Sequence, residues 1–470
     1  MRLAEGIAIV EAIDAIDKEC ASARSGSAQF ERVVLRGIVR ALKDDSGFAS
    51  GLVEALERHP AGNNHPATPL LLRFAHWKDR RLDGFCDLSR PLEKHPKDRR
   101  EVVCNVLHLS MESAVEMEQL RPFSAARLAN EALEQATRFL GPDFAGARLA
   151  AGLSARVLYE QNQIDAADGL IRDRLALSSM QGGLEGALVA YIVGSRIAAA
   201  RCQNRFAVLL LSEAESLAEE WGWPRLAAAS LAERVRILVE DGKLKDARLC
   251  AGRLTSLQMR STPAAGDERV ARFATLTTAR IELAAGVMPG TVERLHEVVA
   301  AALRRREGDF AVEAMLTLSC VLHRIGRDEE AQAETLRVIE LGAHAGLYRT
   351  FLDGGCAVRE LLHWVYRLRT ATGGVLGELR SYVRNLLVGF PAPEPERPSA
   401  RSRHRSGDSL SPRERCIVEL MSHGLSNKQI ARRLGIAPET VKSHAKHILL
   451  KLAAQTRVEA VSRALSLGMI

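Results

Sequence analysis

The sequence predicts an all-α protein, in which a solenoid of stacked helix pairs is followed by a small four-helix module. Three observations lead to this fold class. Only 4% of the 470 residues are aromatic, and Ala, Leu and Arg dominate, a balance that favours helix over strand. A turn motif recurs about every 40 residues. A proline-rich segment then precedes a compact, basic C-terminal piece. The length exceeds what one hydrophobic core usually supports, so two or three domains are expected.

The turn motif consists of a helix-breaking polar or Gly residue, followed five positions later by a small or apolar residue that opens an amphipathic run. The clearest copies are Asn162 with Ala167, Gly242 with Ala247 and Gly326 with Ala331, and weaker ones are Arg121 with Ala126, Gln203 with Val208, and Gly286. Successive turns are 41, 41, 39, 44 and 40 residues apart. Each period therefore has room for two helices of roughly 15 residues and two short turns.

These repeats resemble tetratricopeptide-type (TPR) repeats with a lengthened period, over roughly residues 115–365. The segment AGLYRTFLDGG at 345–355 is similar to the R-x-F-L-D-E-G stretch that closes the superhelical sensor region of large MalT-like regulators. The matching residues are Arg349, Phe351, Leu352, Asp353 and Gly355, with Gly354 in place of the usual acid. The concave face could serve a peptide, a protein partner or a small-molecule inducer, or be a packing scaffold without a ligand.

Four prolines between residues 391 and 398 mark the clearest boundary, because proline at this density prevents a regular helix. We therefore predict an unassigned helical N-terminal region at residues 1–114 and a helical repeat domain at 115–390. A flexible linker at 391–409 and a compact C-terminal module at 410–470 follow. Residues 401–470 contain 13 Lys/Arg and 5 Asp/Glu, a net charge of +8, against −1 for the rest of the chain. This distribution indicates a nucleic-acid partner, with a solvated basic surface as the alternative.

The module reads as four helices, of which the first and fourth open with capping boxes at Ser411 and Thr456. The second begins at Ser426, and the third runs from Pro438 to about Leu452. At 100° per residue, the third helix collects an apolar stripe: Val441, Ala445, Ile448, Leu449 and Leu452.

The opposite face of the third helix is cationic. Lys442 and Lys446 lie one turn apart with Ser443 beside them. Like charges at this spacing cost about a few tenths of a kcal/mol on an isolated helix, a cost that a polyanionic partner offsets. A helix fits the major groove of B-DNA, where lysine can donate to guanine O6 and N7. Thr440 and His444 flank this face and are expected to contact the DNA backbone.

The start of the second helix carries Ser426, Asn427 and Lys428, where backbone N–H groups and the helix dipole favour a phosphate. Simple helix capping is the alternative role for Asn427 and Lys428.

Over its whole length the module resembles the LuxR-type (GerE) helix-turn-helix domain. The matching elements are the Leu410-Ser411-x-Arg413-Glu414 start, the Gly424–Ala431 run, Thr440-Val441-Lys442-x-His444, Lys451-Leu452 and Arg457-x-x-Ala460-Val461. Ala437 stands where the family usually has a capping serine. The resemblance implies a bacterial transcription regulator that contacts bases through Lys442, Ser443 and Lys446. It also implies double-stranded DNA as the partner and a homodimer on DNA formed through the fourth helix.

Other classes of protein receive less support. The ATPase of large MalT-like regulators needs G-x-x-x-x-G-K-[ST], and the one Gly-Lys dipeptide, Gly242-Lys243, lacks the rest of that motif. The chain is thus either a naturally short regulator or part of a longer product, and no enzyme activity or cofactor is expected. His444 and His447 lack a third ligand for a metal. The main alternative is a non-enzymatic interaction scaffold whose helix-turn-helix does not read DNA.

Eight scattered cysteines are interpreted as reduced thiols in helix interiors. No signal peptide and no run of about 18 apolar residues is evident, so a cytoplasmic protein without a membrane partner is predicted.

Overall fold

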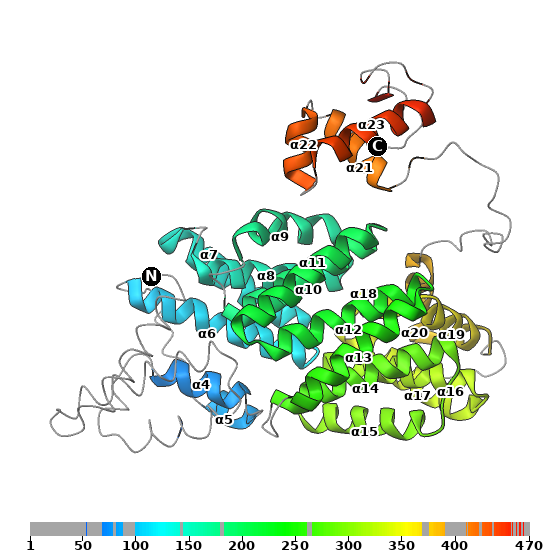
Figure 1. Cartoon of the computed structure of the whole chain (residues 1–470). Coiled ribbons are helices and arrows are strands. Elements are labelled where there is room, and N and C mark those ends of the chain that lie inside the picture. The colour runs from blue at the N-terminus through cyan, green and yellow to red at the C-terminus, as the bar shows by residue number, and fades with distance from the viewer. Residues whose placement is uncertain are drawn as a thin grey trace. The chain divides into compact units, whose positions relative to one another are not determined.

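The computed structural model describes residues 53, 68–78, 81–87, 99–141, 144–178, 183–260, 266–368, 376–390, 410, 412–422, 425–434, 437–452, 454, 457, 460, 461 and 464. In this part of the chain every regular element is an α-helix, which confirms the predicted fold class (Figure 1). The chain divides into two compact units, Met1–Phe390 and Pro391–Ile470. The finer domain boundaries, including the one at 114/115, stay a prediction.

The first unit is built mainly from helix pairs. Two short helices come first: α4 (Thr68–Lys78) and α5 (Leu82–Asp87). The pairs are α6 (Arg99–Glu118) with α7 (Pro122–Leu140), α8 (Ala145–Glu160) with α9 (Ile164–Ser178), α10 (Gly183–Ala200) with α11 (Asn204–Trp221), α12 (Pro224–Glu240) with α13 (Leu244–Arg260), α14 (Gly266–Ala285) with α15 (Thr291–Arg304), and α16 (Gly308–Arg324) with α17 (Asp328–Ala345). Three more helices close the unit: α18 (Arg349–Leu352), α19 (Gly355–Leu368) and α20 (Leu376–Gly389).

Five of the six turns within the pairs follow one rule. A three-residue loop joins the helices, its middle residue is left-handed, and the alanine five positions later is fully buried. The left-handed residues are Leu120, Asn162, Cys202, Gly242 and Gly326, and the alanines are Ala125, Ala167, Ala207, Ala247 and Ala331. The three clear copies predicted from the sequence are confirmed. The small residue fits because helix packing leaves no room there for a larger side chain.

Three weaker copies need correction. At Arg121 and Gln203 the predicted register is wrong by one residue, since Leu120 and Cys202 carry the positive φ of 61° and 59°. Both are non-glycine residues in a conformation that favours glycine. Their residue types therefore did not indicate a turn in the sequence. The turn at Gly286 is longer, and α15 begins only at Thr291.

The first helices of the six pairs form a closed ring. Each of α6, α8, α10, α12 and α14 contacts the next first helix, and α16 contacts α6 again. Several side chains join the two ends of the stack: Arg156 of α8 forms an ion pair with Asp309 of α16, and Arg306 Nη1 lies 2.9 Å from Asp83 Oδ1. Gly308 approaches α6 so closely that a Cβ there would lie 3.0 Å from the Glu118 carbonyl oxygen. The ring surrounds a cavity lined by charged and aromatic side chains.

The segment 348–355, which follows the last repeat, forms hydrogen bonds with α8 in the second helix pair. The Glu160 carboxylate accepts hydrogen bonds from Tyr348 N at 3.1 Å and Thr350 N at 2.9 Å. Asp353 accepts from the Tyr159 hydroxyl at 2.7 Å and pairs with Arg349 at 2.5 Å. The matched Arg and Asp of the sequence motif therefore hold the last repeats against α8.

The glycine that replaces the usual acid in this segment also has a structural reason. A Cβ at Gly354 would lie 3.0 Å from Val358 Cβ, with another Val358 atom still nearer. At the adjacent Gly355, φ is 69° and a Cβ would overlap the Glu240 carboxylate. A side chain at either position would thus require Val358 or Glu240 to move.

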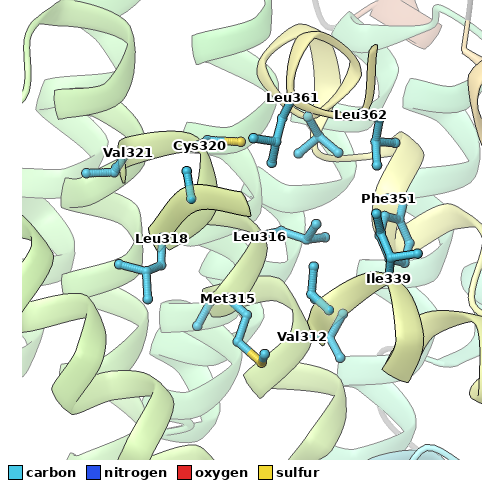
Figure 2. Close-up of a cluster of buried hydrophobic side chains, with 14 of the residues drawn as sticks. Val312, Met315, Leu316, Leu318, Cys320, Val321, Ile339, Phe351, Leu361 and Leu362 are labelled. Carbon is cyan, nitrogen blue, oxygen red and sulfur yellow. The ribbon is translucent and has the colours of Figure 1, made fainter. Parts of the chain in front are cut away.

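The largest hydrophobic cluster fills the space among α14 to α20. Figure 2 shows part of it: Leu316 of α16 lies toward Ile339 and Phe351, and Cys320 lies toward Leu361, whereas Leu318 and Val321 extend to the other side of the helix. Phe351 is fully buried and meets the Tyr382 ring edge to face at 5.9 Å. Burial of this aromatic anchors the 348–355 segment.

Two expectations about side-chain environment need correction. Cys250 and Cys320 are buried as predicted, but Cys86, Cys202 and Cys356 are exposed, and Cys202 lies in a turn. Helix α10 is long and apolar enough to cross a membrane by length and composition, against the expectation that no such segment exists. About half of it is buried inside the ring, which is the usual setting of an apolar core helix.

The second unit contains α21 (Pro412–Ser422), α22 (Asn427–Leu434) and α23 (Pro438–Lys451). Positions 457, 460, 461 and 464 are helical and belong to the predicted fourth helix. Ser411 and Thr456, where the sequence predicts capping boxes, lie outside the described residues.

Candidate nucleic-acid interface

The second unit has its own core, which decides which faces of its helices are turned outward. Val441, Ile448 and Leu452 of the predicted stripe are buried, and Ala445 and Leu449 pack against them. They meet the other buried residues of the unit: Leu410, Ile417, Val418, Met421, Ile430, Ala431, Ala454, Ala460 and Ala464. Burying each large aliphatic side chain contributes about 1.5–3 kcal/mol. The orientation of α23 is therefore fixed by its apolar side.

The polar side of α23 is exposed as the sequence predicts. Thr440, Lys442 and Lys446 are exposed, and His444 is half-buried at the edge of the face. The side chain of Ser443 lies outside the described part of the structure. A helix surface with two exposed lysines one turn apart can enter a duplex groove without uncovering its core.

Helix α22 begins with a capping box that the sequence reading overlooked. Ser426 N donates to Gln429 Oε1 at 2.8 Å, and Gln429 N donates to Ser426 Oγ at 3.4 Å. The S-x-x-Q spacing is the known signal for this arrangement. The Ser426 side chain thus stabilises the helix start, while Lys428 is exposed beside it.

A second feature missed from the sequence is the role of Arg457. Its Nη1 lies 3.3 Å from Asn427 Oδ1, and its Nη2 donates to the Leu425 carbonyl oxygen. Arg457 therefore ties the predicted fourth helix to the loop before α22. The motif residue was visible in the sequence, but its partners are 30 and 32 positions away.

Helix α23 starts without a side-chain cap. The Ala437 carbonyl oxygen accepts from Thr440 N at 3.0 Å and Val441 N at 3.3 Å, as at a helix N-cap. The methyl group of Ala437 cannot accept a hydrogen bond from the helix N-terminus. This is the expected effect of alanine at a position where the family usually has serine.

Comparison with known families agrees with this geometry. Residues 408–464 match the bacterial regulatory proteins of the luxR family, and residues 81–367, more than half of the chain, match the MalT-like TPR region. The chain belongs to the MalT-like, LuxR-type regulators. Both matched families are regulatory, and the 470 residues of this regulator contain no P-loop motif.

Several curated proteins are similar to parts of the regulator. The nitrate/nitrite response regulator protein NarL of Escherichia coli (strain K12) is 54% identical over 56 residues, which are 12% of this chain and 26% of NarL. Nodulation protein W of Bradyrhizobium diazoefficiens is 38% identical over 61 residues, 13% of this chain and 27% of that protein.

The serine/threonine-protein kinase PknK of Mycobacterium tuberculosis is 27% identical over 215 residues, 45% of this chain and 19% of PknK. That match is longer than the C-terminal unit and so includes part of the repeats. The regulator spans at most 27% of the length of these three relatives.

Proposed function

We propose that the protein is a sequence-specific transcription regulator whose helix α23 reads the major groove of DNA. The observation that carries the proposal is the division of α23 into a buried stripe and an exposed face with Lys442 and Lys446. These two lysines contact bases, because they lie on the exposed face of the helix. Ser443, which the sequence places beside Lys442, contacts bases with them.

Residues around this face contact the phosphate backbone. Thr440 and His444 lie on α23 beside the two lysines. Lys428 lies at the start of α22, where backbone N–H groups attract a phosphate. Ser426 and Asn427 contribute chiefly through their backbone, since their side-chain oxygens already bond to Gln429 and Arg457. Because one such module covers a single half-site, the protein binds DNA as a homodimer through the fourth helix.

The repeat unit serves as a sensor or protein-interaction region for an inducer or partner protein, and the regulator works in the cytoplasm. Its role is non-catalytic, although one relative is a kinase. The glycine-rich loop of a kinase covers nucleotide phosphates from a β-sheet, whereas the described residues contain only helices. The second candidate function is an interaction scaffold whose helix-turn-helix does not bind DNA.

The test uses the full-length protein. Genomic fragments that the protein retains are selected, and affinity for one such fragment is measured by fluorescence anisotropy. Lys442→Ala should weaken binding by about 1–3 kcal/mol, roughly 5- to 150-fold, and relax the preference at one base position. Lys243→Ala is the matched control, because it removes one exposed lysine from the repeat unit.

Salt dependence separates the two candidates. A regulator loses affinity steeply as salt rises, since each neutralised phosphate releases counterions. A scaffold gives no salt-dependent binding to any fragment. Unchanged affinity of the Lys442→Ala/Lys446→Ala double variant would show that α23 is not the reading helix.

A further inference from the structure

The ring of first helices encloses a cavity of about 270 Å³ within the repeat unit. Its walls come from α6, α8, α10, α12, α14 and α16 and from the segment 348–355. We propose that this cavity binds a small organic acid, with a carboxylate held by Arg272 and an apolar body lying against Phe273 and Phe310. The proposal specifies the ligand class of the sensor role suggested above, and rests on that role only for the consequence of binding.

Arg272 is the centre of the argument. The residue is only 7% exposed, and its Nη1 forms an ion pair with Glu307 Oε2 at 2.5 Å. Its Nε is buried and makes no hydrogen bond within the described residues. A buried guanidinium N–H without an acceptor is unfavourable, so an arriving carboxylate oxygen would improve its environment.

The carboxylate of Glu307 is not available to Arg272 alone, because two other arginines lie close to it. Its carboxylate also lies 3.3 Å from Arg269 Nε and 3.6 Å from Arg305 Nε. Arg269 has a second acid, Glu118, only at 3.9 Å. Three guanidinium groups therefore approach one buried carboxylate, although Arg305 also has a nearer acid, Glu268, at 2.8 Å.

The other charged side chains of the cavity are more evenly matched. Six arginines and seven acids line it, so its total charge does not select an anion. The matched groups are Glu185 with Arg225 and Lys78, Glu233 with Arg196 and Arg236, Glu313 with Arg280, and Asp309 with Arg156. Selection of an anion is consequently local to Arg272. Burial lowers the pKa of this guanidinium, and a nearby negative charge would oppose that effect.

The apolar part of the site lies directly beside the guanidinium. Phe310 has its ring centroid 5.7 Å from Arg272 Cζ and meets Phe273 edge to face at 5.5 Å. Both rings line the cavity and are half-buried. Leu276 and Ile192 also line the cavity. An apolar body joined to a carboxylate would cover the rings while its oxygens meet Arg272.

The position of the site gives binding a mechanical consequence. Arg272 and Phe273 belong to α14, while Glu307 and Phe310 lie at the start of α16, the helix that closes the ring on α6. A ligand between them bridges the helices next to the closure. Binding would therefore favour the closed arrangement of the repeats over any more open one.

The test is isothermal titration calorimetry on the full-length protein at low salt, with thermal shift as a second readout. Benzoate and phenylacetate are the carboxylate probes, benzamide is the neutral isostere, and benzylamine carries the opposite charge. The carboxylates should bind and raise the melting temperature, and benzamide and benzylamine should bind at least about tenfold more weakly.

Two variants test the residue assignment. Arg272→Met should lower carboxylate affinity at least about tenfold. Arg272→Lys, which keeps the charge but loses the Nε donor, should lower it similarly, and it serves as the test if Arg272→Met folds poorly. Arg253→Met is the control, since it removes an arginine from α13 outside this cavity. The proposal is overturned if neither carboxylate binds, if benzamide binds equally well, or if a folded Arg272 variant keeps full affinity. None of these measurements involves DNA, so failure of the ligand proposal can be distinguished from failure of the DNA-binding proposal that Lys442→Ala tests.

Discussion

Gly342→Ala should destabilise the repeat unit, although the same change usually stabilises a helix. Gly342 lies in the last turns of α17 and is buried. A Cβ at this position would lie 2.7 Å from Phe351 Cζ and 2.8 Å from the Tyr382 hydroxyl oxygen. Real Cβ atoms essentially never approach so closely, so the fully buried Phe351 ring, or α17 itself, must shift.

Two opposing terms set the magnitude. Overpacking of a well-packed core costs about 1–3 kcal/mol, and removing a glycine from a helix interior gains about 0.5–1 kcal/mol. At the middle of both ranges the net loss is about 1 kcal/mol. Gly252→Ala in α13 is the matched control, because nothing lies within 4 Å of the added Cβ. It should stabilise by about 0.5–1 kcal/mol, so the two variants should differ in sign.

Urea unfolding followed by tryptophan fluorescence measures this unit selectively. All four tryptophans lie at positions 77, 221, 223 and 364, and residues 391–470 contain none. Adding Phe351→Leu to Gly342→Ala should recover part of the loss, since the smaller side chain makes room. If Gly342→Ala is as stable as the parent protein, the close packing of segment 348–355 on α17 is wrong.

Two further predictions concern capping and pH. Ala437→Ser should stabilise the second unit by about 1 kcal/mol, because the serine hydroxyl supplies a side-chain cap for α23. Hydrogen exchange of residues 437–452 in the full chain should then slow, and unchanged exchange would contradict the assignment of position 437 as the N-cap of α23. Burial favours the neutral form of Glu233, but Arg196 and Arg236 outweigh it and lower the pKa to about 2 from an ordinary 4.5. A depressed carboxyl pKa adds stability above pH 4.5 that is lost as the pH falls through 2, here about 3 kcal/mol. The stability difference between the parent protein and Glu233→Gln should therefore be larger at pH 7 than at pH 3, and an equal difference at both would refute the ion-pair explanation.

Local features of the repeats could be predicted from the sequence. The turns at Asn162, Gly242 and Gly326 have residues that tolerate left-handed backbone, and the following alanines mark the close approach. Leu120 and Cys202 adopt the same conformation without such a preference, which is why the register there was misplaced. In α23, the 3.6-residue period sufficed to separate the buried stripe from the lysine face.

Features that depend on distant contacts could not be predicted. Arg156 and Asp309 are 153 positions apart, and Thr350 and Glu160 are 190 apart, so nothing local indicates that the repeats close on themselves. The convergence on Glu307 has the same origin, because its partners come from α14 and the end of α15. The role of Arg457 likewise required the position of Asn427 in space.

The contact of α16 with α6 changes how the repeat unit should lose its structure. A linear array of repeats has two terminal units with one neighbour each, and such arrays unravel gradually from those ends. Here the first and last pairs are neighbours, so there is no weakly held terminus among the six pairs from which fraying can spread. Melting should consequently be abrupt and shared by all six pairs, with amide protons in α6 and α16 as slow to exchange as those in the middle of the array.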